Sequence, residues 1–429
     1  MNPALANALR GLLGMTSLLA VCWLFSANRK AINWRLVAYG ILAMVCFYLG
    51  VARINFVHDI FDFLSRGFVR MLDVQIESTR LLFANLIEVR TDSWGFIFAV
   101  RVLPTIIFFS ALSSILYYTG ILQKVVYFFA WMLSKLKISG SESVSTAANI
   151  FLGQTEAPLM IKPYLDRLNR SEMLCIMVGG MANTAGSVLG AYVSFLGAKQ
   201  HNPEFFALHL LTQSILSAPA AIVCSKMLFP QTEQVSTQLN IPKQKLGDNF
   251  LDALSLGTTD GLKLAVNVGA MLIAFTALIN VLNWVLFKVG DLTAMNVLLS
   301  RHTPYSSLSF QMILGYIFSP IAWLIGVNAE DMLKVGQLLG EKTILNEFNA
   351  YVSFSDLLNK NLITDPKSIL ITTYALSGFA NFASIGIQIG GISQLAPNQR
   401  KNLTELGLKA LLGGTIACLM CGCVAGALQ

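Results

Sequence analysis

The chain has 429 residues, of which 55% are hydrophobic and only 12% are charged, and its mean hydropathy is +0.63. An average soluble domain carries roughly 25% charged residues, so the composition excludes a soluble globular protein and indicates an integral membrane protein. The formal net charge of +7 does not indicate nucleic-acid binding, because the Lys and Arg residues are scattered through short loops between apolar runs, as in membrane proteins.

Apolar runs recur along the whole chain at close to the length of about 20 residues that a membrane-crossing helix needs. The first run is followed by Asn28, Arg29 and Lys30 without a small-residue cleavage site, so we expect a retained span and not a signal peptide. Hydropathy predicts spans at 9–25, 36–54, 94–118, 174–196, 205–229, 264–287, 369–391 and 406–428. The expected fold class is an all-α polytopic membrane protein with eight transmembrane helices.

One long segment between the second and third spans has a different pattern. Residues 56–86 carry Asp, Glu and Arg at steps of three and four positions, with apolar residues elsewhere around the helix. This pattern predicts an amphipathic helix, which either lies on the bilayer surface or packs against a neighbouring subunit. Shorter candidates of the same kind lie at 124–138 and 308–326.

The three cysteines near the C-terminus, Cys418, Cys421 and Cys423, form a C-x-x-C-x-C cluster. They lie within a continuous apolar helix without a nearby His or acid. We therefore interpret them as small hydrophobic packing residues and not as metal ligands.

Loop charges predict the orientation. The positively charged connections follow spans one, three, five and seven, and the positive-inside rule makes their side cytoplasmic. Both termini are then expected outside, which is the periplasmic side of a bacterial inner membrane.

Two further segments, 145–168 and 332–357, are apolar but carry acids and amides at their centres. The first contains G-Q-T-E-A-P-L at 153–159, and the second contains N-E-F-N-A-Y at 346–351. Gly153 and Pro158 interrupt a continuous helix, since proline removes a backbone donor and clashes with the preceding turn. Each segment is better explained as two half-helices that meet at a polar tip.

The two segments belong to a repeat. Each is followed by a span with a related polar centre, M-A-N-T-A-G-S at 181–187 and F-A-N-F-A-S at 379–384. The predicted topology makes the halves inverted, and paired broken segments in inverted repeats indicate a substrate site near the bilayer midplane. Because an ionisable group there costs several kcal/mol, Glu156 and Glu347 are expected to face a ligand, an ion or one another.

The polar residues at these centres also constrain the substrate. They are carboxylates, amides and hydroxyls, and neither Arg nor His accompanies them. A phosphorylated or carboxylated substrate would favour a basic partner. We therefore expect a neutral substrate rich in hydroxyl and amide groups.

G-Q-T-E-A-P-L, N-E-F-x-A-Y and the segment G-F-A-N-F-A-S-I-G-I at 378–387 resemble the signature segments of the concentrative nucleoside transporters in their bacterial form. The resemblance covers nearly the whole chain in span order. It implies eight transmembrane helices, interfacial helices and two re-entrant helical hairpins, assembled as a homotrimer.

The same resemblance implies the site residues. The nucleobase would contact Gln154, Thr155, Glu156 and Val188, and the ribose would contact Glu347, Asn381 and Ser384, with Phe379 against sugar and base. The sodium ligands would be the side chains of Asn149 and Asn183 and the backbone carbonyls of Leu152 and Thr184. Position 183 departs from the family pattern, in which serine is common, but an amide oxygen is still a hard ligand suited to such a cation.

The predicted function is a secondary active symporter that imports nucleosides such as uridine with a sodium gradient, by alternating access. A proton-coupled nucleoside or nucleobase transporter is the alternative, because some bacterial members of that family use protons. An intramembrane enzyme or a channel fits less well, because the sequence has neither a metal-ligand cluster nor a repeated polar ring. The preference for purine or pyrimidine stays open.

The expected domain organisation alternates scaffold and transport units. Residues 1–92 and 231–327 are expected to form the scaffold, and residues 93–230 and 328–429 are expected to carry the two hairpin repeats.

Overall fold

The structure is a computed structural model that describes residues 3–87, 97–197, 202–239, 247–303 and 305–429. Within these residues the chain is helical and contains no strand. The described part contains seven stretches that are long and apolar enough to cross a membrane, judged by length and composition: Ala6–Leu24, Trp34–Arg53, Phe98–Tyr118, Arg170–Leu196, Pro203–Leu228, Phe250–Leu292 and Pro397–Leu428.

The N-terminal region consists of three helices. α1 (Pro3–Leu24) is followed by the short η1 (Arg29–Ala31) and by α2 (Trp34–Arg53), whose first turn is capped by the side chain of Asn33. The predicted amphipathic segment forms one helix, α3 (Asn55–Phe83), before η2 (Ala84–Ile87). The predicted domain boundary at 92 and the predicted start of the third span at 94 lie outside the described residues.

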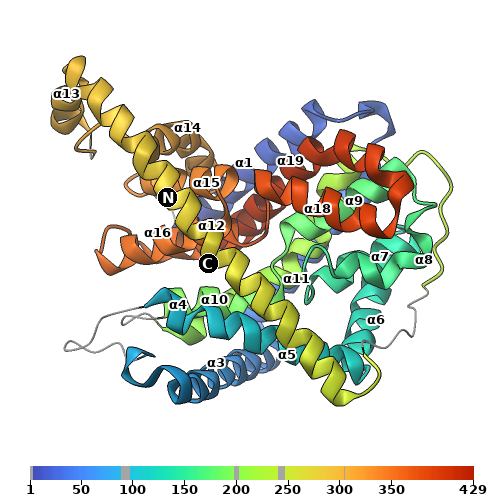
Figure 1. Cartoon of the computed structure of the whole chain (residues 1–429). Coiled ribbons are helices and arrows are strands. Elements are labelled where there is room, and N and C mark those ends of the chain that lie inside the picture. The colour runs from blue at the N-terminus through green and yellow to red at the C-terminus, as the bar shows by residue number, and fades with distance from the viewer. Residues whose placement is uncertain (1–2, 88–96, 198–201, 240–246, 304) are drawn as a thin grey trace.

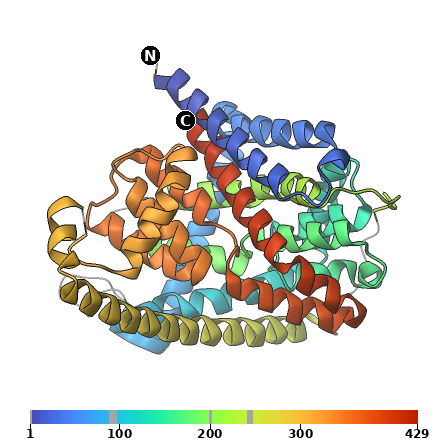
Figure 2. The same cartoon turned by 90° about the horizontal axis from the view of Figure 1, so that it is seen from above.

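A long helix, α12 (Phe250–Leu292), crosses the molecule and lies along one edge of it (Figures 1 and 2). It is longer than the predicted span at 264–287, because its first turns carry Asp252, Asp260 and Lys263 and are therefore not apolar enough for a hydropathy window. α4 (Phe98–Arg101) leads into α5 (Leu103–Tyr118), which packs on α12. A Cβ at Gly261 of α12 would lie 2.8 Å from the Ile107 Cα, so these two helices are in backbone contact.

The shorter predicted amphipathic segments are also helices: α6 (Ile121–Ser134) and α14 (Phe310–Leu324), the latter preceded by α13 (Met295–His302). The buried centre is formed by α9 (Arg170–Ala182), α10 (Gly186–Leu196), α11 (Pro203–Leu228), α17 (Pro366–Leu376), α18 (Phe382–Leu395) and, after η4 (Pro397–Gln399), α19 (Arg400–Leu428). α1 packs against α19, and the two chain ends lie on the same side of the molecule (Figure 2).

The predicted spans at 174–196 and 369–391 are not continuous helices. The first divides into α9 and α10, and the second divides into α17 and α18. In the second, Gly378 has φ +100°, and a Cβ there would lie 2.7 Å from the Ala182 carbonyl oxygen. A backbone in the left-handed region cannot continue an α-helix, and glycine adopts it without strain. The seventh predicted span is therefore a broken helix.

The two segments with polar centres are also each divided. The first contains α7 (Gly140–Asn149), then η3 (Ala157–Ile161) and α8 (Lys162–Leu165); the second contains α15 (Met332–Ile344) and α16 (Glu347–Asn359). α7 begins earlier than predicted because Ser139 and Glu142 form a capping box at its start. We call these segments, 140–165 and 332–359, hairpin 1 and hairpin 2.

All seven cysteines are free thiols, and the three in α19 are buried. The Cys418 thiol donates to the Ser377 carbonyl oxygen at 2.7 Å. These cysteines pack in the core, in agreement with their interpretation from the sequence.

Candidate functional site

The two helix breaks lie against each other at the centre of the molecule. The backbone N–H of Gly378 donates to the Thr184 hydroxyl oxygen at 2.8 Å, and the N–H of Phe379 donates to the Asn183 carbonyl oxygen at 3.3 Å. The hydroxyls of Thr184 and Ser377 are 2.9 Å apart. In a continuous helix these backbone groups would form hydrogen bonds within the helix. Here they form hydrogen bonds between the two repeats.

The tip of hairpin 1, residues 150–156, is an irregular turn. The carbonyl oxygen of Phe151 accepts from the N–H of Gly186 at 3.0 Å, which holds the tip beside the break between α9 and α10. The Gln154 amide donates to the Ser384 hydroxyl at 3.1 Å and so connects this tip to α18. The Glu156 carboxylate accepts a 3.3 Å bond from the Gly153 N–H, and it is exposed to the cavity beside it.

The tip of hairpin 2 is tighter and more regular. Asn346 caps α16 by accepting from the Asn349 N–H at 2.9 Å, so Glu347 lies in the first turn. A carboxylate at a helix N-terminus is favoured by the helix dipole. The Glu347 carboxylate is buried and accepts from the Asn381 amide at 2.7 Å, while Asn381 itself caps α18. This carboxylate is therefore held by the residue that begins the second half of the broken helix.

A cavity of about 600 Å³ lies between the two tips, the two breaks and α12. Its lining includes all eight residues expected at the substrate site: Gln154, Thr155, Glu156, Val188, Glu347, Phe379, Asn381 and Ser384. Val188 is provided by α10 and Phe379 by the second break, so apolar surface lies beside the polar tips. The cavity volume is in the range of typical small-molecule sites.

The cavity also includes side chains that were not predicted. Asp260, Lys263 and Asn267 of α12 line it opposite the tips, and Ser110 of α5 lies nearby. Their spacing contained a signal, because positions separated by three and four residues share one face of a helix. A polar stripe on an otherwise apolar helix indicates a wet cavity or a partner.

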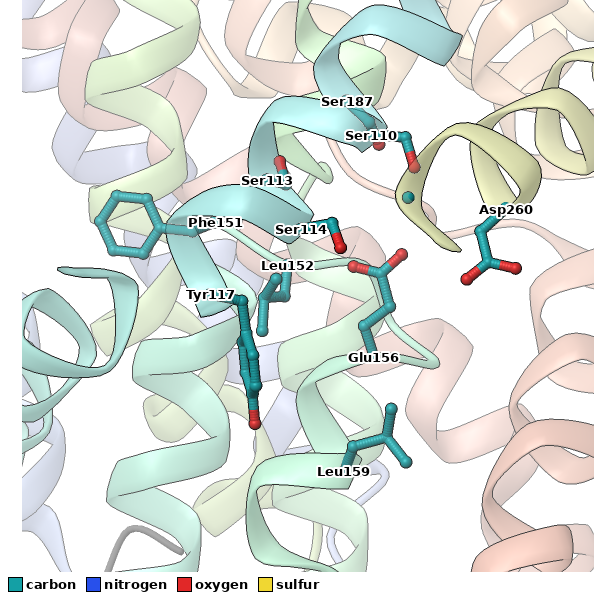
Figure 3. A pocket seen from close by; sticks show the side chains of 11 residues that line it. Ser110, Ser113, Ser114, Tyr117, Phe151, Leu152, Glu156, Leu159, Ser187 and Asp260 are labelled. Atoms are coloured by element: carbon teal, nitrogen blue, oxygen red, sulfur yellow. The ribbon is translucent and has the colours of Figure 1, made fainter. Parts of the chain in front are cut away.

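A smaller cavity of about 240 Å³ adjoins the first and shares Glu156, Asp260, Ser110 and Ser187 with it. Figure 3 shows the Glu156 carboxylate in the space between hairpin 1 and α12, with Asp260 at the same space. Further lining hydroxyls come from α5, namely Ser113, Ser114 and Tyr117. The two cavities together follow the contact of α5 and α12 with hairpin 1.

Of the four residues expected to bind sodium, Asn149 ends α7, Leu152 belongs to the tip of hairpin 1, and Asn183 and Thr184 lie in the break between α9 and α10. Asn149 ends α7 and is buried, and neither atom of its side-chain amide has a hydrogen-bond partner among the described residues. Its Nδ2 would be 3.2 Å from a Cβ at Gly179 of α9, so the two helices are close here. The side-chain oxygen of Asn183 accepts from the Thr184 N–H at 3.2 Å.

This set of neutral oxygens fits a monovalent cation. An unpartnered buried amide is costly unless a ligand completes it, and amide and carbonyl oxygens are hard ligands. The described residues contain no group of three or more His, Cys, Asp or Glu side chains suited to a metal ion.

Three family models match the chain and together cover most of it. They are described as Na+ dependent nucleoside transporter N-terminus, matched at residues 13–86, as Nucleoside recognition, matched at 99–199, and as Na+ dependent nucleoside transporter C-terminus, matched at 209–426. The C-terminal model includes hairpin 2 and the break between α17 and α18, and the N-terminal model includes α2, α3 and the second half of α1.

The chain is also similar to curated and solved proteins. It is 38% identical to Solute carrier family 28 member 3 of Mus musculus over 97% of this chain, which spans 58% of the mouse protein. It is 39% identical to an uncharacterized transporter of Haemophilus influenzae, with 98% of this chain and 97% of that protein aligned. A solved structure of CNTnw in an inward-facing substrate-bound state matches with a TM-score of 0.88 and 36% identity, over 98% of both chains.

The family models, the apolar helices and the central cavity all indicate the same class of membrane protein. This chain is an integral membrane protein of the sodium-dependent nucleoside transporter family, the concentrative nucleoside transporters.

Proposed function

We propose that this chain is a symporter that imports nucleosides such as uridine by alternating access, with sodium as the coupling ion. The observation that carries the proposal is the cavity of about 600 Å³, which is lined by both hairpin tips and by residues of both helix breaks. A site assembled from inverted, broken segments suits transport, because both halves contact one substrate.

Hairpin 1 supplies the groups for the nucleobase. Gln154, Thr155 and Glu156 present an amide, a hydroxyl and a carboxylate, which match the carbonyl and N–H edges of a base. The Gln154 side-chain oxygen is buried without a hydrogen-bond partner among the described residues, so a ligand N–H would complete it. Val188 and Phe379 supply the apolar surface for the flat ring.

Hairpin 2 supplies the groups for the ribose. The Glu347 carboxylate accepts from Asn381 on one oxygen, which leaves lone pairs for the neighbouring hydroxyls of a sugar. Ser384 begins α18 beside Asn381 and adds a hydroxyl. A carboxylate that is already fixed by the protein loses little entropy when it binds a sugar hydroxyl.

The sodium ion would be held by the side chains of Asn149 and Asn183 and by the carbonyl oxygens of Leu152 and Thr184. Support comes from the unpartnered amide of Asn149 and from the bond of the Phe151 carbonyl to Gly186, which brings the two segments together. Because sodium would join the tip of hairpin 1 to the break behind it, sodium binding would order the nucleobase side of the site. This provides a physical basis for coupling.

In the membrane, hairpins 1 and 2 would be re-entrant and would move together along α12, and α17–α18 would complete eight crossings. Residues 1–92 and 231–327 would form the scaffold, as expected from the sequence. The transport part was expected at 93–230 and 328–429. One helix of that part, α5, would instead belong to the scaffold, because it is in backbone contact with α12. The cavity contacts the N-terminal half of α12, which the charge rule places on the cytoplasmic side, so we infer an inward-facing state.

The scaffold would also form a homotrimer in a bacterial inner membrane, with both termini in the periplasm. α12 exposes a row of large apolar side chains, among them Ile273 at 75% and Trp284 at 64%, and α3 exposes Phe63 at 75%. Lipid and neighbouring copies would cover these surfaces. Cross-linking of the protein in native membranes measures the number of copies.

The function is tested by uptake of radiolabelled uridine into proteoliposomes with an inward sodium gradient, an inward proton gradient or no gradient. We expect uptake above equilibrium with sodium alone. Accumulation with protons alone would support the proton-coupled alternative, and flux that never exceeds equilibrium would indicate a channel.

A further inference from the structure

A buried lysine occupies the break in the second repeat. Lys342 lies in the last turn of α15 and is 2% exposed. Its ammonium donates to the carbonyl oxygens of Ala375 at 2.9 Å and Ser377 at 3.1 Å. These carbonyls are at the C-terminal end of α17, where the helix provides no further backbone N–H.

Within the part of the chain that the structure describes, this ammonium has no carboxylate in direct contact. Among the described residues no ion pair involves Lys342, although Glu347 is near enough to interact with it electrostatically. A buried charge without a partner is costly. Here the partial negative charge of a helix C-terminus and two carbonyl oxygens offset that cost.

The corresponding place in the first repeat is different. The last residue of α7 is Asn149, which is neutral and lies close to the end of α9, with both amide atoms unpartnered among the described residues. In each repeat, therefore, the last turn of the first half-helix of the hairpin lies against the end of the broken helix. One repeat places a lysine there, and the other places an amide that a cation would complete.

We infer that the Lys342 ammonium is a tethered cation, which takes in the second repeat the place that the coupling sodium takes in the first. The inference rests on the sodium site of the proposed function. A tethered charge is never released, so the second break keeps its carbonyls satisfied throughout the cycle. Phe379 and Asn381, which follow this break, then keep their positions whether or not sodium is bound.

Removal of the lysine should therefore leave a site that binds a free cation. Lys342→Ala leaves both a space and two carbonyl oxygens, which a sodium ion with water can fill. Lys342→Met is the matched control, because it removes the same charge but its side chain fills the space. Both are made in an Asn149→Ala background, so that the first site contributes no sodium response.

The measurement is the yield of monodisperse protein and its melting temperature in sodium chloride and in choline chloride at equal ionic strength. We expect Asn149→Ala/Lys342→Ala to be recovered in higher yield in sodium and to melt several degrees higher there, and the methionine variant to respond to neither salt. Equal behaviour of the alanine variant in the two salts, whether it is stable in both or lost in both, overturns the inference.

The proposed sodium site is tested separately, in the wild type and in the single Lys342→Ala variant, which both keep Asn149. If the wild type gains no stability from sodium, the assignment of the first site fails, whereas a new sodium response of the Lys342→Ala variant still supports the tethered cation. If the wild type responds and the Lys342→Ala variant does not, only the tethered cation fails.

Discussion

Hairpin 1 turns through residues 150–156 between α7 and a short 3₁₀ helix, whereas hairpin 2 turns through Leu345 and Asn346 between two α-helices of 13 residues each. In hairpin 2 the carboxylate of Glu347 is fixed by Asn381. In hairpin 1 the carboxylate of Glu156 accepts a bond from Gly153 of its own loop and is exposed to the cavity. The first tip can adapt to its ligand, and the second is already organised.

Under the proposed function, this difference would allow one site to accept several bases and still require one sugar. Fixed groups discriminate strongly, because an analogue without the matching hydroxyl leaves a buried polar group unpaired. A turn held by few contacts can rearrange around purine or pyrimidine at small cost. We therefore expect strict selection of the ribose and tolerant selection of the base.

The hairpins also differ at their bases. Hairpin 1 is anchored by an ion pair between Glu142 of α7 and Lys226 of α11, both buried, and the ammonium also donates to the Ser171 hydroxyl at 2.9 Å. The described part of hairpin 2 has no such pair. The adaptable tip thus belongs to the hairpin with the firmly held base.

The largest expected effect comes from breaking this anchor. Lys226→Met leaves the Glu142 carboxylate buried without its partner, which costs about 3–5 kcal/mol of stability. We expect a large fall in the melting temperature of the purified protein, measured in detergent.

The control is the double variant Lys226→Met/Glu142→Gln, which removes the charge while glutamine preserves the capping box with Ser139. It should recover most of the loss. If the double variant melts as low as the single variant, the cost comes from packing and not from the unpaired charge.

The next effect tests the organised tip. Glu347→Gln should weaken uridine binding about tenfold to a hundredfold, since a charge-assisted hydrogen bond is worth roughly 1.5–3 kcal/mol. The measurement is uridine affinity by calorimetry, with 2′-deoxyuridine and 3′-deoxyuridine to identify the hydroxyl that Glu347 binds. Wild-type affinity in this variant would refute the ribose assignment.

The matched variant Glu156→Gln changes the same functional group at the adaptable tip. We expect a smaller loss, because the loop can reorient the amide toward the base. An equal loss in the two variants would show that both carboxylates are equally fixed and would remove the difference between the tips.

Sequence patterns predicted the two interrupted segments because glycine, proline and acids within apolar runs are local signals. Both tips, and all eight residues expected to contact substrate, surround one cavity. The breaks in the two following spans were missed as breaks, since a hydropathy window averages over a few extended residues. Gly378 turns the chain because the Ala182 carbonyl is next to it, a contact between repeats that no local pattern contains.

The polar stripe of α12 was also missed, although its spacing is visible in the sequence. Asp260 and Lys263 were assigned to a loop, because their charges lowered the local hydropathy, and Asn267 was assigned to the start of a span. The pairing of Glu142 with Lys226 connects distant segments, and only the packed fold brings them together.

A moderate effect is expected at the sodium site behind hairpin 1. Asn149→Ala should raise the sodium concentration for half-maximal uridine uptake by roughly fivefold, the effect of losing about 1 kcal/mol of ligand interaction. Ser143→Ala on the same helix is the control, since its hydroxyl donates to the Ser139 carbonyl within the helix. An unchanged sodium requirement in Asn149→Ala would contradict the site.

The smallest and most specific effect concerns the movement of the two tips along α12. Thr155 lines the same cavity as Asn267, and Ala274 is two helical turns further along the same stripe. If both hairpins move together against α12, cysteines at 155 and 267 should cross-link in the inward-facing state, and cysteines at 155 and 274 should cross-link more when the outward-facing state is populated. A scaffold pair at Ser114 and Ala253, whose hydroxyl and carbonyl are 2.7 Å apart, should cross-link equally in every condition.

Changing the sodium and uridine gradients shifts the population of the two states, so the measurement is the ratio of the 155–267 product to the 155–274 product. A constant ratio in a protein that is transporting uridine would mean that the hairpins do not travel along α12, and opening of one tip at a time, beginning with the adaptable tip of hairpin 1, would then explain access to the site.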